Sequence, residues 1–202
     1  MSLLDARDAR SMEGGASFSL ANRLGRLVWA LAWLTLARWT PVPLHGWRCA
    51  VARLFGARIG KRVRLYPTVR IWWPGNLEMA DYACLGGGVN CYNQGDIYLG
   101  YRAVVSQGAQ LCASSHDIDD YYNQLTLGPI RVEAYAWVAT EAFVGPGVTV
   151  GEGAVLGARG VAMRSLDPWT VYTGNPAVVL RKRAFRNAPK PLPHAVRVPG
   201  GA

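Results

Sequence analysis

The chain has 202 residues; 50% are hydrophobic, 17% are charged, and the formal net charge is +9 at pH 7. This length and composition predict one folded core with appendages and exclude a largely disordered chain. The positive charge favours anionic partners, but no basic run interleaved with aromatic residues occurs, so a nucleic-acid-binding protein is not expected.

The N-terminal part of the chain, residues 1–58, is predicted to be a lead to the folded core. Residues 1–18 are expected to be flexible. Asn22 to Phe55 is expected to form two helices, because Pro41-Val42-Pro43 interrupts an otherwise helix-compatible segment.

An uncharged apolar stretch lies inside this lead. Leu27 to Ala37 is 11 residues long, contains two tryptophans, and is bracketed by Arg26 and Arg38. It is too short to span a bilayer, which requires roughly 20 apolar residues. Two alternatives stay open: the segment packs on the body of the protein or on a neighbouring subunit, which we favour, or residues 20–40 contact a membrane surface.

A six-residue repeat dominates the rest of the chain. Ile, Leu or Val occupies 13 of 15 positions spaced six apart, with a slip of four residues after Val89 and a longer break after Leu111. A small or β-branched residue usually follows each anchor by four positions. This period fits neither an α-helix nor a simple alternating strand. The anchor positions are 59, 65, 71, 77, 83, 89, 99, 105, 111, 132, 138, 144, 150, 156 and 162.

Short strands that turn a corner every six residues explain this pattern. Three sides form an 18-residue coil, in which large anchors fill the interior and small residues lie at the corners. The predicted fold class is therefore mainly β: a parallel β-helix of about five coils over residues 59–167, on the order of 24 Å long at the usual inter-strand spacing. The predicted coils are 59–76, 77–94, 99–116, 132–149 and 150–167.

Two interruptions leave the coils. Asn93 to Tyr98 is expected to be a small bulge, and residues 117–131 form a 15-residue excursion that starts directly after His116. Loops ejected from a rigid solenoid often carry function. We therefore expect the functional site beside this excursion.

The segment after the last coil, residues 168–202, is predicted in three parts. Residues 168–177 leave the coils in a turn, Val178 to Arg186 forms a short basic helix, and residues 187–202 are a disordered tail.

Cysteine and histidine usage bounds the chemistry. The four cysteines show no CxxC spacing and the chain opens without a recognisable cleavable signal, which favours reduced thiols in a cytoplasmic protein. Of the three histidines only His116 lies in the repeat, whereas His45 lies in the helical lead and His194 in the tail. A corner beside an ejected loop is open to solvent, so His116 is the candidate general base, and a three-histidine zinc site is excluded.

The residues around this candidate base carry a family pattern. Ser106 to Asp117 reads SQGAQLCASSHD, residues 89–93 read VNCYN, and Gly174 to Ala177 reads GNPA. Over about residues 17–184 the chain resembles the hexapeptide-repeat acyltransferase superfamily and, within it, the colanic-acid-type exopolysaccharide O-acetyltransferases. The resemblance implies a homotrimer and a left-handed β-helix, although parallel crossovers are mostly right-handed.

The implied activity is transfer of an acetyl group from acetyl-CoA, as co-substrate and without a metal, to a hydroxyl of a sugar or glycan in exopolysaccharide biosynthesis. His116 would deprotonate the acceptor hydroxyl. Asp117 would orient the imidazole or line the sugar site, with a solvated turn residue as the alternative. The family contacts the acceptor or the acetyl group at the positions of Asn90, Tyr92 and Asn93.

Coenzyme A in this superfamily lies along the β-helix, in the groove between two subunits. For two of the residue sets that the resemblance implies, an alternative without a role in binding stays open: the tryptophan caps a coil corner, and the basic run is a solvated helix face. The residues implied are Trp137 at the thiol end, Ala139 and Gly157 along the pantetheine, Pro176 at the adenine, and Arg181 and Lys182, followed by Arg183, at the phosphates.

Three further alternatives remain. Cys112, four residues before His116, would be a nucleophile in a covalent mechanism, but a cysteine in a coil is usually a packing residue. The acceptor would be an antibiotic or another xenobiotic if the same base served a different pocket. The third alternative is a β-helix scaffold without catalytic activity.

Overall fold

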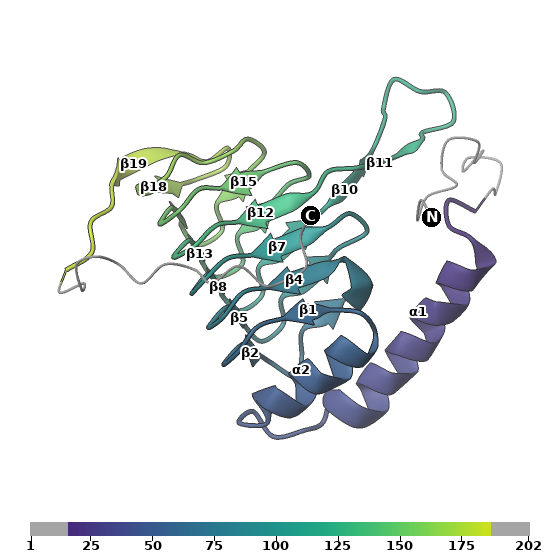
Figure 1. Ribbon diagram of the computed structural model, residues 1–202. Helices are drawn as coiled ribbons and strands as arrows, with labels where there is room; N and C mark the ends of the chain where they lie inside the picture. The colour runs from purple at the N-terminus through teal and green to yellow at the C-terminus, as the bar shows by residue number, and fades with distance from the viewer. Residues whose placement is uncertain (1–15, 187–202) are drawn as a thin grey trace.

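The chain winds into a parallel β-helix, with one helix packed at its N-terminal end and a second helix running along its side (Figure 1). The computed structural model describes residues 16–186. Three sheets form the sides of the β-helix, and each coil adds one short strand to each sheet. The predicted fold class is confirmed except at its C-terminal end.

The lead contains the two expected helices. Ser19 caps the first one, because its hydroxyl accepts a hydrogen bond from the Asn22 N–H at 3.3 Å. Pro41 and Pro43 lie in the turn between the helices, where a missing N–H costs nothing. Residues 1–15, most of the expected flexible lead, lie outside the described residues. The elements are α1 (Leu20–Ala32), a π-helical segment η3 (Trp33–Ala37) that continues it, and α2 (His45–Leu54).

Each coil passes from sheet A to sheet B to sheet C. Sheet A consists of β1 (Arg58–Ile59), β4 (Leu77–Met79), β7 (Ile97–Leu99), β12 (Ile130–Val132) and β15 (Thr149–Val150). Sheet B consists of β2 (Arg64–Leu65), β5 (Cys84–Leu85), β8 (Val104–Val105), β13 (Trp137–Val138), β16 (Val155–Leu156), β18 (Thr170–Thr173) and β19 (Val178–Lys182). Sheet C consists of β3 (Arg70–Ile71), β6 (Asn90–Tyr92), β9 (Gln110–Cys112), β14 (Phe143–Val144) and β17 (Val161–Ala162). Five coils are complete, and β18 belongs to a partial sixth.

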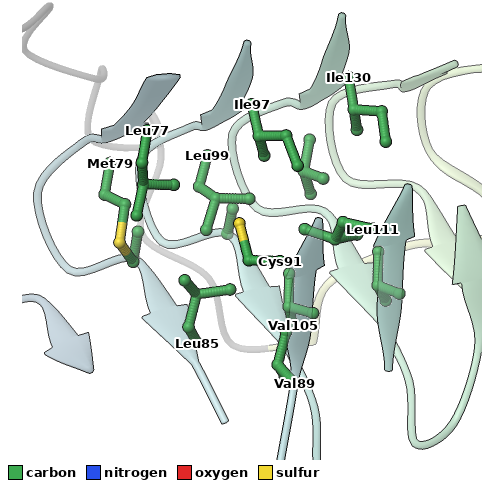
Figure 2. Packing of buried hydrophobic residues seen from close by; sticks show 14 of the residues in the cluster. Leu77, Met79, Leu85, Val89, Cys91, Ile97, Leu99, Val105, Leu111 and Ile130 are labelled. Atoms are coloured by element: carbon green, nitrogen blue, oxygen red, sulfur yellow. The ribbon is translucent and has the colours of Figure 1, made fainter. Parts of the chain in front are cut away.

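Hydrophobic side chains from the sheets meet inside the β-helix (Figure 2). Leu77, Ile97 and Ile130 follow one another along sheet A, and none is more than 1% exposed. Leu85 and Val105 are paired on sheet B and are fully buried. Stacked coils thus form one continuous apolar core, which is the reason that the hydrophobic period follows the coil.

The pairing register corrects the predicted length of the first coils. Arg58 pairs with Glu78, so these coils repeat every 20 residues. The 18-residue repeat appears only in the last coils, where Arg131 pairs with Thr149. The predicted 18-residue coil therefore holds for the C-terminal part of the β-helix alone.

The predicted slip of four residues after Val89 is wrong for the same reason. Two extra residues enter after Ile71, and two more enter after Cys91, where the bulge at 93–98 was expected. Ala83 and Val89 hold the small-residue positions of the second coil and are not its anchors. Small positions and anchors are both buried, so hydrophobicity alone does not distinguish their phase.

The extra residues widen the corner between sheets C and A. In the first of these corners, η4 (Pro74–Asn76), the Asn76 side chain donates to two main-chain carbonyls of the next corner at 3.1 and 2.7 Å. In return, Asn93 Oδ1 accepts from the N–H groups of Trp72 and Trp73 at 3.0 and 3.2 Å. The two wide corners are therefore stacked and hydrogen-bonded to each other.

The C-terminal end contains a strand in place of the basic helix predicted over Val178 to Arg186. β19 pairs antiparallel with β18, and the β-branched Val178 and Val179 favour this extended backbone. The strand covers an edge of sheet B that would otherwise have unpaired main-chain groups. The tail expected at 187–202 lies outside the described residues.

One face of α1 and η3 packs on the first coil. Trp29 and Trp33 are 3% and 7% exposed, and their indole N–H groups donate to the carbonyls of Ile71 and Val69 at 2.8 and 3.1 Å. This is the packing that the sequence analysis favours for the segment. Within residues 16–186, no helix is long and apolar enough to cross a bilayer.

A buried arginine joins the two helices to the β-helix. Arg48 on α2 is fully buried, and it donates to the carbonyl of Leu65 at 2.6 Å, to Thr40 Oγ1 at 2.8 Å and to the carbonyl of Pro41 at 2.9 Å. It also donates to the carbonyl of Val42. Its guanidinium therefore satisfies the main chain of the turn between η3 and α2.

The substitution Arg48→Met should destabilise the protein. Methionine keeps the apolar stem but removes every donor, and a buried acceptor without a partner costs about 1–3 kcal/mol. We expect the midpoint of thermal unfolding, followed by circular dichroism, to fall by about 5 °C or more. Arg58→Met is the matched control, because it removes only an exposed ion pair with Glu78, worth about 0–1 kcal/mol. Equal melting of the two variants would contradict this role of Arg48.

Candidate active site

The third corner between sheets C and A carries a hairpin. After β9, strand β10 (Ser114–His116) pairs antiparallel with β11 (Leu125–Leu127), which places His116 opposite Leu125. The excursion predicted at 117–131 is this hairpin tip and its return to β12. The hairpin projects from the side of the β-helix (Figure 1), and the candidate base lies at the last pair of its strands, directly before the tip.

The hairpin selects the tautomer of the neutral His116 ring. Nδ1 lies 2.7 Å from the carbonyl oxygen of Asn123. A carbonyl oxygen only accepts hydrogen bonds, so Nδ1 is the donor, and in the neutral imidazole Nε2 is then the nitrogen with the lone pair. Asn123 adopts φ of +52°, a left-handed conformation in which asparagine is several-fold enriched. The exposed imidazole is thereby presented in the tautomer that accepts a proton at Nε2.

Asp117 does not orient the imidazole in this structure, because the Asn123 carbonyl occupies Nδ1. The Asp117 main-chain N–H donates to the Gln124 carbonyl at 2.8 Å, and its carboxylate accepts from the Asp119 N–H at 3.1 Å. This is the arrangement of a turn residue, the alternative that the sequence leaves open.

A hollow of about 500 Å³ opens beside His116, between the second and third wide corners and the N-terminal end of α1. Its floor comes from successive coils of sheet C, and α1 supplies the opposite wall. Figure 1 shows α1 running along the β-helix from α2 toward the level of the hairpin. The lining residues are Ala16, Ser17, Phe18, Arg23, Arg26, Tyr92, Gln94, Cys112, Ser114, Ser115, His116 and Leu125.

The three predicted acceptor residues have different environments. Tyr92 lines the hollow and is 37% exposed, and its hydroxyl accepts from Gln94 Nε2 at 2.9 Å. Asn90 is partly buried on β6 and is not among the lining residues. The prediction for Asn93 is corrected: it is fully buried, and its amide is bonded to the main chain of Trp72 and Trp73. It joins two corners and cannot touch an acceptor.

The residues predicted to bind the pantetheine lie on a different corner. Trp137 is on sheet B, 43% exposed, and donates to Ser106 Oγ at 2.8 Å. Ala139 and Gly157 follow it on successive coils, at the corner between sheets B and C. Their N–H groups donate within the β-helix, so only their carbonyl oxygens have a lone pair left for a ligand. One chain therefore does not bring these residues to His116.

The predicted phosphate-binding run has strand geometry. Arg181 and Lys182 are exposed neighbours on β19, and neighbouring strand residues project from opposite faces. Lys182 Nζ donates to Thr170 Oγ1 at 3.0 Å. Arg183 donates to the carbonyls of Tyr135 and Gly153 at 3.0 and 2.8 Å. Pro176 is exposed in the turn before the strand.

Thiol and metal chemistry have little support in this site. Cys112 is partly exposed and lines the hollow, and its Sγ lies 3.3 Å from the Ser114 carbonyl, to which it donates. Burial raises the pKa of Cys91 to about 12, so this thiol stays protonated. Across residues 16–186, no three His, Cys, Asp or Glu side chains gather as a metal site would require.

Sequence reasoning missed the contribution of α1. Arg23 and Arg26 reach the hollow from a helix that lies about 90 residues before His116 in the sequence, and Phe18 reaches it from the residues just before that helix. A repeat pattern says nothing about where an appended helix docks. In the structure the Arg26 guanidinium lies 4.3 Å from the centroid of the Trp72 ring, a contact between residues far apart in the sequence.

Solved structures share this architecture. A hexapeptide-repeat-containing acetyltransferase from Vibrio cholerae superposes with a TM-score of 0.75 over 83% of this chain and 95% of that one, at 20% identity, and it has also been solved with acetyl coenzyme A. A galactoside acetyltransferase in complex with coenzyme A gives 0.70 over 86% of this chain and 91% of that one, at 16% identity. At these identities the likeness shows the fold, a left-handed parallel β-helix.

The chain belongs to the family of the colanic acid biosynthesis acetyltransferases and has the fold of the hexapeptide-repeat acetyltransferases. The assignment rests on the putative colanic acid biosynthesis acetyltransferase WcaF of Escherichia coli (strain K12). This chain is 42% identical to it over 166 residues, which cover 82% of this chain and 91% of the relative. No family model matches the sequence.

The corrected role of Asn93 can be tested with Asn93→Asp. The carboxylate keeps the shape, loses the Nδ2 donor to Trp73, and places a charge in a fully buried site. We expect the melting temperature to fall by about 5 °C or more, since an unsatisfied buried group costs about 1–3 kcal/mol and a charged one costs more. Asn90→Asp, at a partly buried position of the preceding strand β6, should melt like the parent chain. A change in the KM of the acceptor without loss of stability would restore Asn93 as a binding residue.

Proposed function

We propose that this chain transfers the acetyl group of acetyl-CoA to a sugar hydroxyl in exopolysaccharide biosynthesis, with His116 as general base. The observation that carries the proposal is the hydrogen bond from His116 Nδ1 to the Asn123 carbonyl, which leaves Nε2 free above an open hollow. The name of the 42%-identical relative, a colanic acid biosynthesis acetyltransferase, supports an exopolysaccharide as the destination.

The reaction follows from this geometry. Nε2 of His116 takes the proton of the acceptor hydroxyl while the oxygen attacks the thioester carbonyl carbon of acetyl-CoA. The carbon–sulfur bond then breaks, and the proton passes from the imidazolium to the leaving thiolate. The histidine ends as it began, with its proton on Nδ1. General-base assistance of this kind contributes about 10²–10⁴ in rate.

A homotrimer is part of the proposal. His116 lies at a corner between sheets C and A, whereas Trp137, Ala139 and Gly157 lie on sheet B and its corner with sheet C. A three-sided body can place the first corner of one copy against the second corner of the next copy around a threefold axis. Each site would then combine the base of one chain with the acetyl-CoA groove of another.

His116→Ala should lower turnover by about 10²-fold or more. Release of coenzyme A from acetyl-CoA is measured with a thiol reagent, together with acetylation of the saccharide by mass spectrometry. Ile118→Ala, on the same hairpin and 87% exposed, is the control and should keep the parent rate. Native mass and melting temperature should match for both variants. A His116→Ala enzyme with the parent rate would eliminate this base.

We also propose that the free face of α1 rests on the cytoplasmic surface of a membrane. Leucines repeat along this face over residues 20–34 and are each more than half exposed, although a helix face of this kind is normally covered. Trp39 and Trp47 are 72% and 50% exposed nearby, and tryptophan is enriched at headgroup depth. The basic net charge of +9 suits an anionic lipid surface. The leucines are Leu20, Leu24, Leu27, Leu31 and Leu34.

The triple substitution Leu27→Gln, Leu31→Gln and Leu34→Gln tests this contact. The full-length protein should float with vesicles of equal parts phosphatidylglycerol and phosphatidylcholine, and the triple variant should stay at the bottom of the gradient. Ile118→Gln removes one exposed apolar residue elsewhere and should float like the parent. If the substitution instead splits an assembly of several copies without affecting flotation, the face binds a second copy and the membrane proposal is wrong.

A further inference from the structure

The wall of the hollow that α1 supplies is cationic. Arg23 and Arg26 are one turn apart on the helix and both line the hollow, whereas no Asp or Glu is among its lining residues. The pKa of Arg26 is lowered by burial first and by the proximity of Arg23 as well. Two guanidinium groups thus share one pocket with no acidic partner in its lining.

Arg26 is held in place while most of its donors stay unused. Its Nε donates to Asn22 Oδ1 at 3.0 Å, and its guanidinium stacks 4.3 Å from the Trp72 ring. In the part of the chain that the structure describes, neither its Nη groups nor Arg23 make a hydrogen bond or ion pair with another side chain. A fixed planar guanidinium with free Nη donors is well suited to bind a carboxylate or phosphate in bidentate fashion.

A second group of the hollow also lacks a partner. Gln94 is 7% exposed, and its Nε2 donates to the Tyr92 hydroxyl at 2.9 Å. Its Oε1 is buried and accepts from no donor among residues 16–186. Such an acceptor is satisfied by water or by a ligand that donates a hydrogen bond, and an alcohol O–H is the donor that a saccharide offers.

We infer that the hollow binds a saccharide that carries an anionic group, with Arg23 and Arg26 on the anion and Gln94 on a neighbouring hydroxyl. This inference rests on the proposed function of His116 and specifies the class of acceptor. The anion is either a sugar carboxylate or the phosphate of an activated or lipid-linked sugar. Both present the oxygen pairs that arginine recognises, and both leave other hydroxyls free for acetylation.

Three small probes separate these sources: methyl α-glucoside as the neutral reference, methyl glucuronoside for the carboxylate and glucose 1-phosphate for the phosphate. Dissociation constants are measured by calorimetry on the full chain, without acetyl-CoA, and KM is measured with it. We expect at least one anionic probe to bind about tenfold tighter than the neutral one, since charge-assisted hydrogen bonds are roughly twice as strong as neutral ones. The probe that gains the advantage identifies the source.

The double substitution Arg23→Gln and Arg26→Gln should remove this advantage while leaving the affinity for methyl α-glucoside and the KM of acetyl-CoA unchanged. The loss of Arg26 could loosen α1 from Trp72, so Arg23→Gln is also measured alone. It should reduce the preference for the anionic probe and leave the melting temperature unchanged. Arg58→Gln, a surface arginine paired with Glu78, is the matched control and should keep the advantage in full.

Equal binding of neutral and anionic probes, or an advantage that persists in the double variant, would overturn the inference. The proposed function fails independently of it. If an anionic probe binds through the arginines but no saccharide accepts an acetyl group, the acetyl-transfer proposal is wrong and the anion site stands. If neutral and anionic saccharides are acetylated with the same KM, acetyl transfer stands and the anion site is wrong.

Discussion

The hydrogen-bond ladder between successive coils governs where the rest of this structure can vary. Each strand donates to the coil next to it in parallel register, so a coil cannot gain or lose a residue within a strand without turning every following side chain to the opposite face. Extra residues are therefore confined to corners. In this chain they enter at the same corner, between sheets C and A, in the first three coils. Stacking places these corners one above another, and the hollow beside His116 opens along that line.

This corner also explains why amide side chains are buried in an otherwise apolar β-helix. A wide corner leaves main-chain N–H and C=O groups without ladder partners, and a buried main-chain group without a partner is costly. Asn76 and Asn93 supply these partners from one corner to the next. The same positions look functional in sequence, since polar residues beside a candidate base usually are. Burial and bonding decide between the two roles, and neither can be seen in the sequence.

The fold was predictable to the extent that the core imposes a period on the sequence. Six-residue spacing predicted three sheets and the excursion after His116, because large side chains must return to the same interior. The phase of the second coil was not predictable, since Ala83 and Val89 are as buried as the true anchors. The strand β19 was not predictable either, because pairing with the edge of β18 decides the conformation of this short basic segment. His116 could be identified from its place at a corner, but its tautomer depends on a carbonyl seven residues later that only the hairpin brings back.

α1 shows how one appended helix can serve several surfaces at once. Trp29 of α1 and Trp33 of η3 donate to carbonyls of the first coil, which fixes the rotation of the helix about its axis. That rotation turns the leucine face away from the β-helix, and it directs Arg23 and Arg26 toward the hollow. Side chains at i and i+3 or i+4 share a face of a helix, so the positions of the leucines and of the arginines depend on each other. A shift of the sequence by one residue would rotate every side chain by about 100° around the helix axis, which would bury the leucines and turn the arginines away from the hollow. Under the proposals made for this chain, the contacts that orient α1 would thereby hold the acceptor site next to the membrane surface from which a lipid-linked saccharide would arrive.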